Sequence, residues 1–107
     1  MTIVHMLDGN RLVLALNGEL DLTTSDALAQ ALDEMLNHFP QKQVALDLGE
    51  VDFIDSSGLG VILGRYRRLN QQGRQLSLVS VKPNVRVILE IAGILSLVPV
   101  SFTGVKA

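Results

Sequence analysis

Two neighbouring serines, Ser56 and Ser57, follow Asp55 where an apolar run gives way to a helical pattern. A helix that begins there directs free backbone N–H groups, and the positive end of its dipole, towards the serine side chains. A phosphate on one hydroxyl would be held well in that position. Serine is also a common N-cap, so one of the two could serve only to start the helix. The pattern predicts a regulatory phosphorylation site, Ser56 in preference, on a protein that works by binding a partner.

The same stretch fits no enzyme motif. Residues 58–64 resemble a dinucleotide-binding fingerprint, but they place one residue too many between the second and third glycines. Residues 80–82 also supply no acid for a ribose. The serines lack the Gly-x-Ser-x-Gly elbow of serine hydrolases, and the sequence offers a catalytic triad only two histidines, His5 and His38. We therefore predict no catalytic residue, no cofactor and no enzyme activity.

Several aspartates keep a different class of protein open. Asp47, Asp52 and Asp55 lie close together in the sequence, and Lys82 follows the next strand. Such a set could form a receiver-like domain that accepts phosphate on an aspartate. That site also needs a pair of acids after the first strand to hold magnesium, and Asp8 stands alone there. The receiver-like phospho-aspartate domain is thus the alternative, and no metal site is predicted.

The composition of the 107 residues is that of one globular domain, 1–107. Hydrophobic residues make up 48% and charged residues 19%, which suffices for a single core. The absence of cysteine excludes disulfides and thiolate metal sites. The N-terminus has no basic region before an apolar run, and no window approaches the roughly 18 apolar residues of a membrane span. We expect a cytoplasmic protein that does not contact a membrane.

Charge is divided unevenly along the chain. Residues 1–55 carry ten of the eleven acidic residues, and residues 56–107 carry seven of the nine basic ones. If the two halves presented different faces, the polarised surface would steer a partner, but packing into one compact domain would mix the charges. The arginines come with one tyrosine and no recognised motif, so nucleic-acid binding is not expected.

Apolar periodicity predicts strands alternating with helices. Asp8-Gly9-Asn10 is typical of a hairpin turn between two apolar runs. Thr23 and Asp26 have the spacing of a capping box, Pro83 suits the first turn of a helix, and Pro99 suggests an edge strand. The expected strands are 2–7, 11–16, 44–48, 75–81 and 97–102, and the expected helices are 25–38, 58–72 and 83–92. This order predicts an α/β fold with a mixed, mostly parallel sheet and helices packed on it.

The second predicted helix has two distinct faces. At 100° per residue, one side would pack on the sheet with Leu59, Ile62, Leu63, Tyr66 and Leu69. The opposite side carries Val61, Gly64, Arg65 and Arg68, with Gly60 nearby. Each glycine costs about 1 kcal/mol of helix propensity relative to alanine. Small residues, an outward Val61 and arginines predict a partner-binding face, although the glycines could instead let the helix approach its own sheet.

Three motifs carry a family resemblance that covers nearly the whole chain. They are Gly18-Glu19-Leu20-Asp21, then Asp55-Ser56-Ser57-Gly58-Leu59-Gly60 continued by Val61-Ile62-Leu63-Gly64-Arg65-Tyr66, and finally Pro83-Asn84-Val85. With them the sequence closely resembles the bacterial STAS-domain anti-sigma factor antagonists. The resemblance implies a single STAS domain. Relatives usually close with a further helix, whereas here residues 103–107 alone follow the last predicted strand.

The resemblance also implies roles for single residues. Ser56 would be phosphorylated by a partner that is both an anti-sigma factor and a serine kinase, and Ser57 would cap the helix. Asp21, Asp55 and Gly58 would flank the site. The unphosphorylated antagonist would bind the kinase and so free a sigma factor, phosphate would inactivate it, and a serine phosphatase would restore it. A non-switching STAS scaffold subunit of a larger complex is the other reading.

Overall fold

The two apolar runs at the start of the chain pair as the predicted hairpin. In the computed structural model, which describes residues 1–102, β1 (Thr2–Asp8) runs antiparallel to β2 (Arg11–Asn17). The turn between them needs a left-handed residue, and Gly9 supplies it with φ of 60°. The hairpin prediction is therefore confirmed.

The remaining elements follow in the predicted alternation. They are α1 (Ser25–His38), β3 (Gln43–Glu50), α2 (Ser56–Gln71), β4 (Leu76–Val81), α3 (Pro83–Ile91), a 3₁₀ turn at Ile94–Ser96, and β5 (Val100–Phe102). The last strand is shorter than the expected 97–102 because the N–H groups of Leu97 and Val98 both donate back to the carbonyl of Ile94, at 3.0 Å, as the chain leaves the 3₁₀ turn. It lies at the edge of the sheet, as Pro99 suggested. No helix among residues 1–102 is long and apolar enough to cross a membrane.

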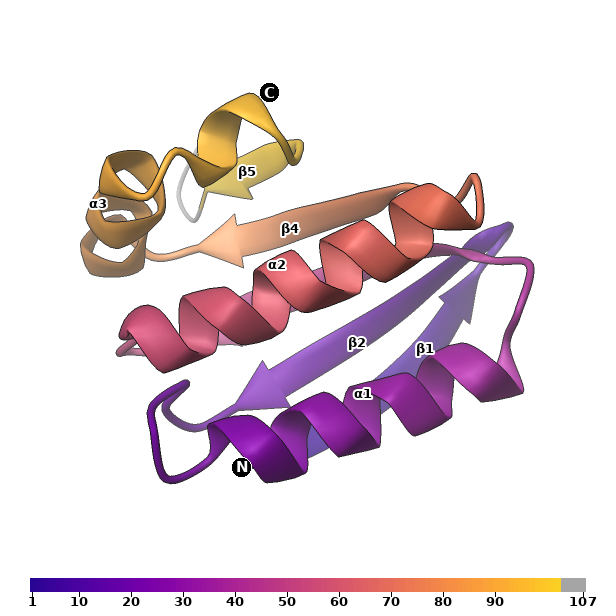
Figure 1. Ribbon diagram of the computed structural model, residues 1–107, viewed down its shortest axis with the longest axis horizontal. Coiled ribbons are helices and arrows are strands. Elements are labelled where there is room, and N and C mark those ends of the chain that lie inside the picture. The colour runs from indigo at the N-terminus through magenta and orange to yellow at the C-terminus, as the bar shows by residue number, and fades with distance from the viewer. Residues whose placement is uncertain (103–107) are drawn as a thin grey trace.

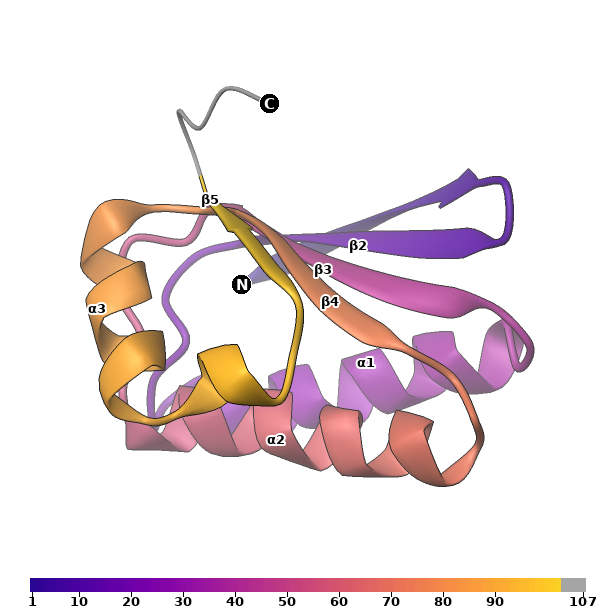
Figure 2. The same cartoon turned by 90° about the horizontal axis from the view of Figure 1, so that it is seen from above.

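Within the described chain the sheet has the order β1-β2-β3-β4-β5, and the pairs from β2 onward are parallel. Parallel neighbours need crossover connections, which are almost always right-handed. Helices α1 and α2 accordingly lie side by side on one face of the sheet (Figure 1). Figure 2 shows α3 on the same side, at the edge where β3 and β4 end. The predicted α/β class, with a mixed and mostly parallel sheet, is confirmed.

The core lies between the sheet and this helix layer. Alternate residues of β2 point towards the helices, so that Leu12, Leu14 and Leu16 are at most 1% exposed. They meet Leu28, Leu32 and Leu36, which recur at helical spacing along α1. Burial of these side chains fixes the position of α1 on the sheet.

The start of α1 differs from the prediction. Thr24 is the N-cap and makes no side-chain capping bond, so the capping box of Thr23 and Asp26 is not formed. The backbone N–H groups of Thr23 and Thr24 donate instead to Asp21 Oδ1, at 3.0 and 3.2 Å. A carboxylate two or three residues upstream therefore satisfies the donors that a capping box would have satisfied.

Candidate functional site

The predicted phosphorylation site lies where β2 and β3 end at one edge of the sheet. The loops that follow these strands are joined by an isolated parallel bridge between Leu20 and Ile54. Leu20 N–H donates to the carbonyl of Phe53 at 3.0 Å, and Asp55 N–H donates to the carbonyl of Leu20 at 3.1 Å. These bonds bring Asp21, on the first loop, next to the start of α2, although the two segments are distant in the sequence.

A glycine is required where α2 passes over the first loop. A Cβ at Gly58 would lie 2.4 Å from the carbonyl oxygen of Leu20 and 2.8 Å from a side-chain carbon of Ile54. Both contacts are shorter than any van der Waals distance, and one of them is with backbone. Gly58, which the resemblance placed beside the site, therefore lets α2 start against this loop.

Asp55, not Ser57, caps α2. The carboxylate oxygen Oδ1 of Asp55 accepts the backbone N–H groups of Ser57 at 2.8 Å and Gly58 at 3.1 Å. The expectation that Ser57 is the cap is wrong, because the helix begins at Ser56, two residues before the expected start at Gly58. Neither serine hydroxyl makes a hydrogen bond within residues 1–102, and Ser56 is exposed whereas Ser57 is half-buried.

The two acids beside the serines are both held by hydrogen bonds. Thr23 Oγ1 donates to Asp21 Oδ1 at 2.7 Å, and together with the backbone donors of Thr23 and Thr24 it lowers the pKa of Asp21 against a smaller effect of desolvation. Asp55 Oδ2 accepts the backbone N–H of Leu22 at 3.3 Å. Asp21 is thus an anion at neutral pH, and both carboxylates lie where the two loops meet, next to the start of α2.

Two exposed apolar side chains next to the serines were not predicted from the sequence. Leu22, whose N–H contacts Asp55, is 76% exposed, and Phe53, three residues before Ser56, is 49% exposed. The sequence signal that could have found them is a large apolar residue in each of the two loops, Leu22 before α1 and Phe53 before α2. The loop after β3, which carries Phe53, also connects to the start of α3, because Lys82 pairs with Asp52 and Asn84 donates to the carbonyl of Asp52.

The predicted outward face of α2 is only partly outward. Val61 is 6% exposed and belongs to the core, so the expectation of an exposed Val61 is wrong. Arg65 and Arg68 both pair with Asp33 of α1, at 3.2 and 3.0 Å. The physical reason is that α2 has two neighbours, the sheet and α1, so a second stripe of the helix is covered. Gly60 is exposed, and a Cβ at Gly60 or Gly64 would meet no atom within 4 Å.

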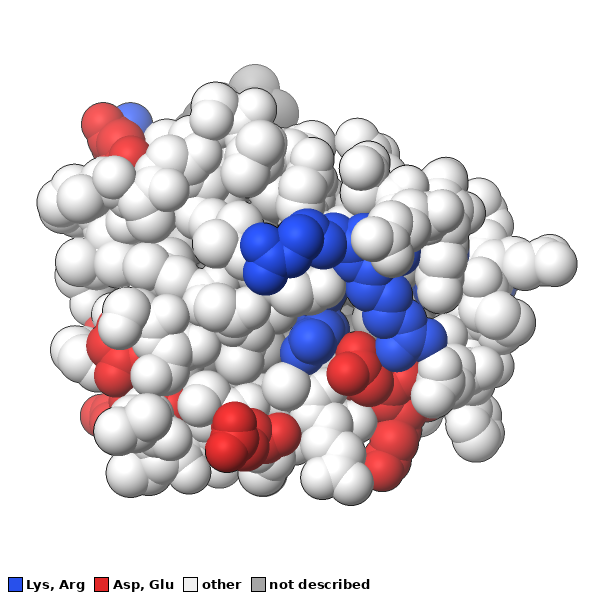
Figure 3. Space-filling view, viewed as in Figure 1, with Lys and Arg blue, Asp and Glu red and all other residues white. Residues whose placement is uncertain are grey.

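The uneven charge of the two halves of the chain is largely mixed by folding. Asp33 faces arginines of α2, and Asp52 faces Lys82. In Figure 3 the basic side chains lie along α2 directly beside acidic side chains over α1. No separated positive and negative faces result on this side of the molecule.

The aspartates that suggested a receiver-like domain have separate roles. Asp47 Oδ1 accepts the backbone N–H of Gly49 at 2.9 Å, Asp52 pairs with Lys82, and Asp55 caps α2. Residues 1–102 contain no group of three or more acids, histidines or cysteines placed to hold a metal ion.

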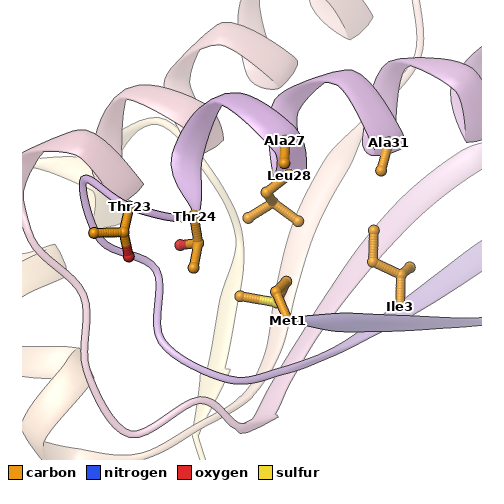
Figure 4. A pocket seen from close by; sticks show the side chains of 7 residues that line it. All are labelled: Met1, Ile3, Thr23, Thr24, Ala27, Leu28 and Ala31. Atoms are coloured by element: carbon orange, nitrogen blue, oxygen red, sulfur yellow. The ribbon is translucent and has the colours of Figure 1, made fainter.

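A separate hollow of about 330 Å³ lies between α1 and the start of β1. In Figure 4 the side chains of Met1 and Ile3 point towards α1, and two threonines close one end. Its lining consists of Met1, Ile3, Thr23, Thr24, Ala27, Leu28 and Ala31. Ser56 and the residues predicted for partner binding are not among them.

Together, the fold and this junction define a small α/β domain that presents an exposed serine at the N-terminus of a helix. A family model of the STAS domain matches residues 3–107. The chain is 38% identical to the anti-sigma F factor antagonist of Paenibacillus polymyxa over 96 residues, which cover 90% of this chain and 82% of the relative. The chain belongs to the STAS-domain family, and to the anti-sigma factor antagonists within it.

Solved structures of lower identity share the fold. The anti-sigma factor antagonist SpoIIAA in its unphosphorylated form is 21% identical with a TM-score of 0.69, covering 97% of this chain and 90% of that one. The Bacillus cell fate determinant SpoIIAA in the phosphorylated form is 22% identical with a TM-score of 0.69, covering 92% and 90%. The family resemblance inferred from the three sequence motifs is confirmed by the family match and by the curated relative. The short closing segment, residues 103–107, lies outside the described residues.

Proposed function

We propose that this protein is an anti-sigma factor antagonist whose binding is switched off by phosphate on Ser56. The observation that carries the proposal is the exposed hydroxyl of Ser56 at the first position of α2, where Asp55 already caps the helix. A phosphate there replaces no hydrogen bond of the folded chain, so the fold tolerates both states. SpoIIAA, which shares the fold, has been solved in both phosphorylated and unphosphorylated forms.

The partner in this proposal is an anti-sigma factor that is also a serine kinase. The unphosphorylated protein binds it and so frees a sigma factor, and a serine phosphatase restores the active form after phosphorylation. The names of the curated relatives support the anti-sigma factor as partner. Binding, rather than catalysis on a substrate of its own, is then the activity of this chain.

The docking surface would be the serine face, which we define as Ser56 with Leu22, Phe53 and Gly60. Leu22 and Phe53 expose apolar surface on the two loops that meet beside Ser56, and covering such surface with a partner is favourable. Gly60 adds no side chain, so a partner can come close to the backbone of α2. This face continues along α2 with Gly64, Arg65 and Arg68. Val61 belongs to the core and only supports this part of α2 from inside.

Phosphate would oppose docking by its charge. A phosphoserine adds about 1.5 to 2 negative charges at neutral pH, and here it would stand beside the carboxylates of Asp21 and Asp55. The N–H groups of Ser57 and Gly58 are already bound to Asp55, so the first turn of α2 offers the phosphate less compensation than an uncapped helix would. Covering an uncompensated dianion with a partner costs desolvation free energy, which weakens the complex.

Incubation with the purified cognate kinase and ATP, followed by mass spectrometry, tests the assignment. We expect one phosphate on the wild-type protein and on Ser57→Ala, and none on Ser56→Ala. In calorimetry, Ser56→Ala should bind the kinase as the wild type does, and Ser56→Asp should bind at least tenfold more weakly, about 1.4 kcal/mol. Phosphate on Ser57 with Ser56 untouched would refute the assignment, and constitutive binding without any phosphoserine would favour the scaffold subunit.

A further inference from the structure

A groove of about 380 Å³ lies between the first halves of α1 and α2, beside the serine face. Its lining consists of Leu22, Ser25, Asp26, Ala29, Ser57, Gly60, Val61 and Arg65. The two helices start at the same edge of the sheet and run side by side (Figure 1). The groove therefore begins near the serines and ends, two turns further along α2, at Arg65.

Arg65 is an incompletely satisfied cation at that end. Its side chain is 16% exposed, and its Nε lies 3.2 Å from Asp33 Oδ1. Despite this ion pair, neither Nε nor Nη1 has a hydrogen-bond acceptor among the described residues, and both atoms are buried. Buried donors without acceptors are uncommon in folded proteins, because each loses its hydrogen bonds to water without replacement.

The carboxylate opposite Arg65 is shared. Asp33 Oδ1 also accepts a hydrogen bond from Arg68 Nη1 at 3.0 Å, and Arg68 donates a further bond to Asn37. One carboxylate thus faces two guanidinium groups, which leaves an excess of positive charge at this point of the α1–α2 seam. Figure 3 shows the basic side chains of α2 gathered here with acidic ones next to them.

The rest of the groove has room for a side chain of a partner protein. Ala29 and Gly60 on its walls are small, and the space beside Gly60 is open for at least 4 Å from the position of a Cβ. Leu22 forms an exposed apolar rim. Asp26 places a negative charge at the serine end, opposite to the positive end at Arg65, so the charge along the groove changes sign.

We propose that this groove receives an acidic side chain, Asp or Glu, of the anti-sigma factor, with its carboxylate paired to Arg65. The inference rests on the function proposed above and adds the chemistry of the partner. An apolar neighbour of that acid packs between Gly60 and Leu22, and the charge on Asp26 excludes the reverse orientation of the segment. Arg65 is then the residue through which α2 selects an acidic partner segment.

The test is a calorimetric titration of the purified anti-sigma factor of the source organism into the wild-type protein and five variants. Arg65→Ala should weaken binding 10- to 100-fold, which corresponds to about 1.4 to 2.8 kcal/mol. Arg67→Ala, an exposed arginine on the same helix that does not line the groove, is the matched control and should change affinity less than twofold. Gly60→Leu should fill the groove mouth, and so weaken binding without lowering the melting temperature.

Asp33→Asn separates recognition from support of the fold. If Arg65 serves the partner, loss of its internal counter-ion leaves the affinity unchanged or raises it. If Arg65 merely holds α1 against α2, Asp33→Asn weakens binding as much as Arg65→Ala does, and the proposal is wrong.

A charge reversal identifies the partner's acid. Arg65→Glu should lose binding, and exchanging one acid of the anti-sigma factor for arginine, found by scanning its acids one at a time, should restore it.

The outcomes also separate this proposal from the one on which it rests. Wild-type protein that fails to bind the anti-sigma factor overturns both. Wild-type binding that Ser56→Asp weakens, combined with unchanged affinity of Arg65→Ala and Gly60→Leu, overturns the groove alone.

Discussion

The carboxylate of Asp55 accepts the backbone N–H of Ser57 at 2.8 Å, so the aspartate caps α2 and the two serines that follow it are the first residues of the helix. This relationship leaves Ser56 without a structural task. It also concentrates the stability of the helix start in Asp55, the residue next to the proposed phosphorylation site.

Replacing Asp55 by alanine should therefore lower stability. The change removes the cap of α2 and the acceptor for Leu22 N–H, with an expected cost of about 0.5–2 kcal/mol in chemical denaturation. Asp55→Asn keeps an acceptor oxygen and should lose much less. Ser57→Ala is the control for the alternative cap, and a loss as large as that of Asp55→Ala would contradict the assignment.

Gly58 and Gly60 form a matched pair in the same helix. Gly58→Ala drives a methyl group into the carbonyl of Leu20, and overpacking of this kind costs about 1–3 kcal/mol. Gly60→Ala meets no atom and should raise stability by up to about 1 kcal/mol through helix propensity. Thermal and urea denaturation of both variants checks the contrast, and equal effects would mean that α2 does not lie against the loop.

Asp21 should make the stability of the folded state depend on pH in the acid range. Its pKa lies below the ordinary value of 3.8, chiefly because Thr23 donates a side-chain hydrogen bond to it. A lowered carboxyl pKa stabilises the folded state above the ordinary value, and this contribution is lost as the pH falls through the folded pKa. In Thr23→Ala the pKa of Asp21 should rise towards its ordinary value in a carboxyl NMR titration. An unchanged titration would exclude the hydroxyl as the cause.

Arg74 should matter for stability rather than for binding. It is 6% exposed and donates to the backbone carbonyls of Phe39 and Lys42, at 2.6 and 2.7 Å. Burial lowers its pKa, followed by repulsion from Arg68, yet the group stays charged near neutral pH. Arg74→Met leaves these carbonyls without their donor and should cost about 1–3 kcal/mol in urea denaturation. Arg67→Ala, at an exposed site, should change stability by less than about 0.5 kcal/mol.

The sequence by itself determined the order of the elements and the family. Apolar spacing separated strands from helices because a strand repeats every two residues and a helix about every 3.6. Asp8-Gly9-Asn10 and Pro83 marked the hairpin and the start of α3, since left-handed turns and first helical turns select those residue types. The motif from Asp55 to Gly60 identified the family without any coordinates.

Only the tertiary structure decided which atoms meet. A helical wheel gives the direction of Val61 and Arg65 but not the neighbour on that side. There α1 packs beside α2, so Val61 joins the core and Arg65 pairs with Asp33 of α1. Likewise, Asp21 and Asp55 come together through the pairing of Leu20 with Ile54, a contact between segments far apart in the chain. Local periodicity carries no information on such contacts, because they depend on how separate elements pack in space.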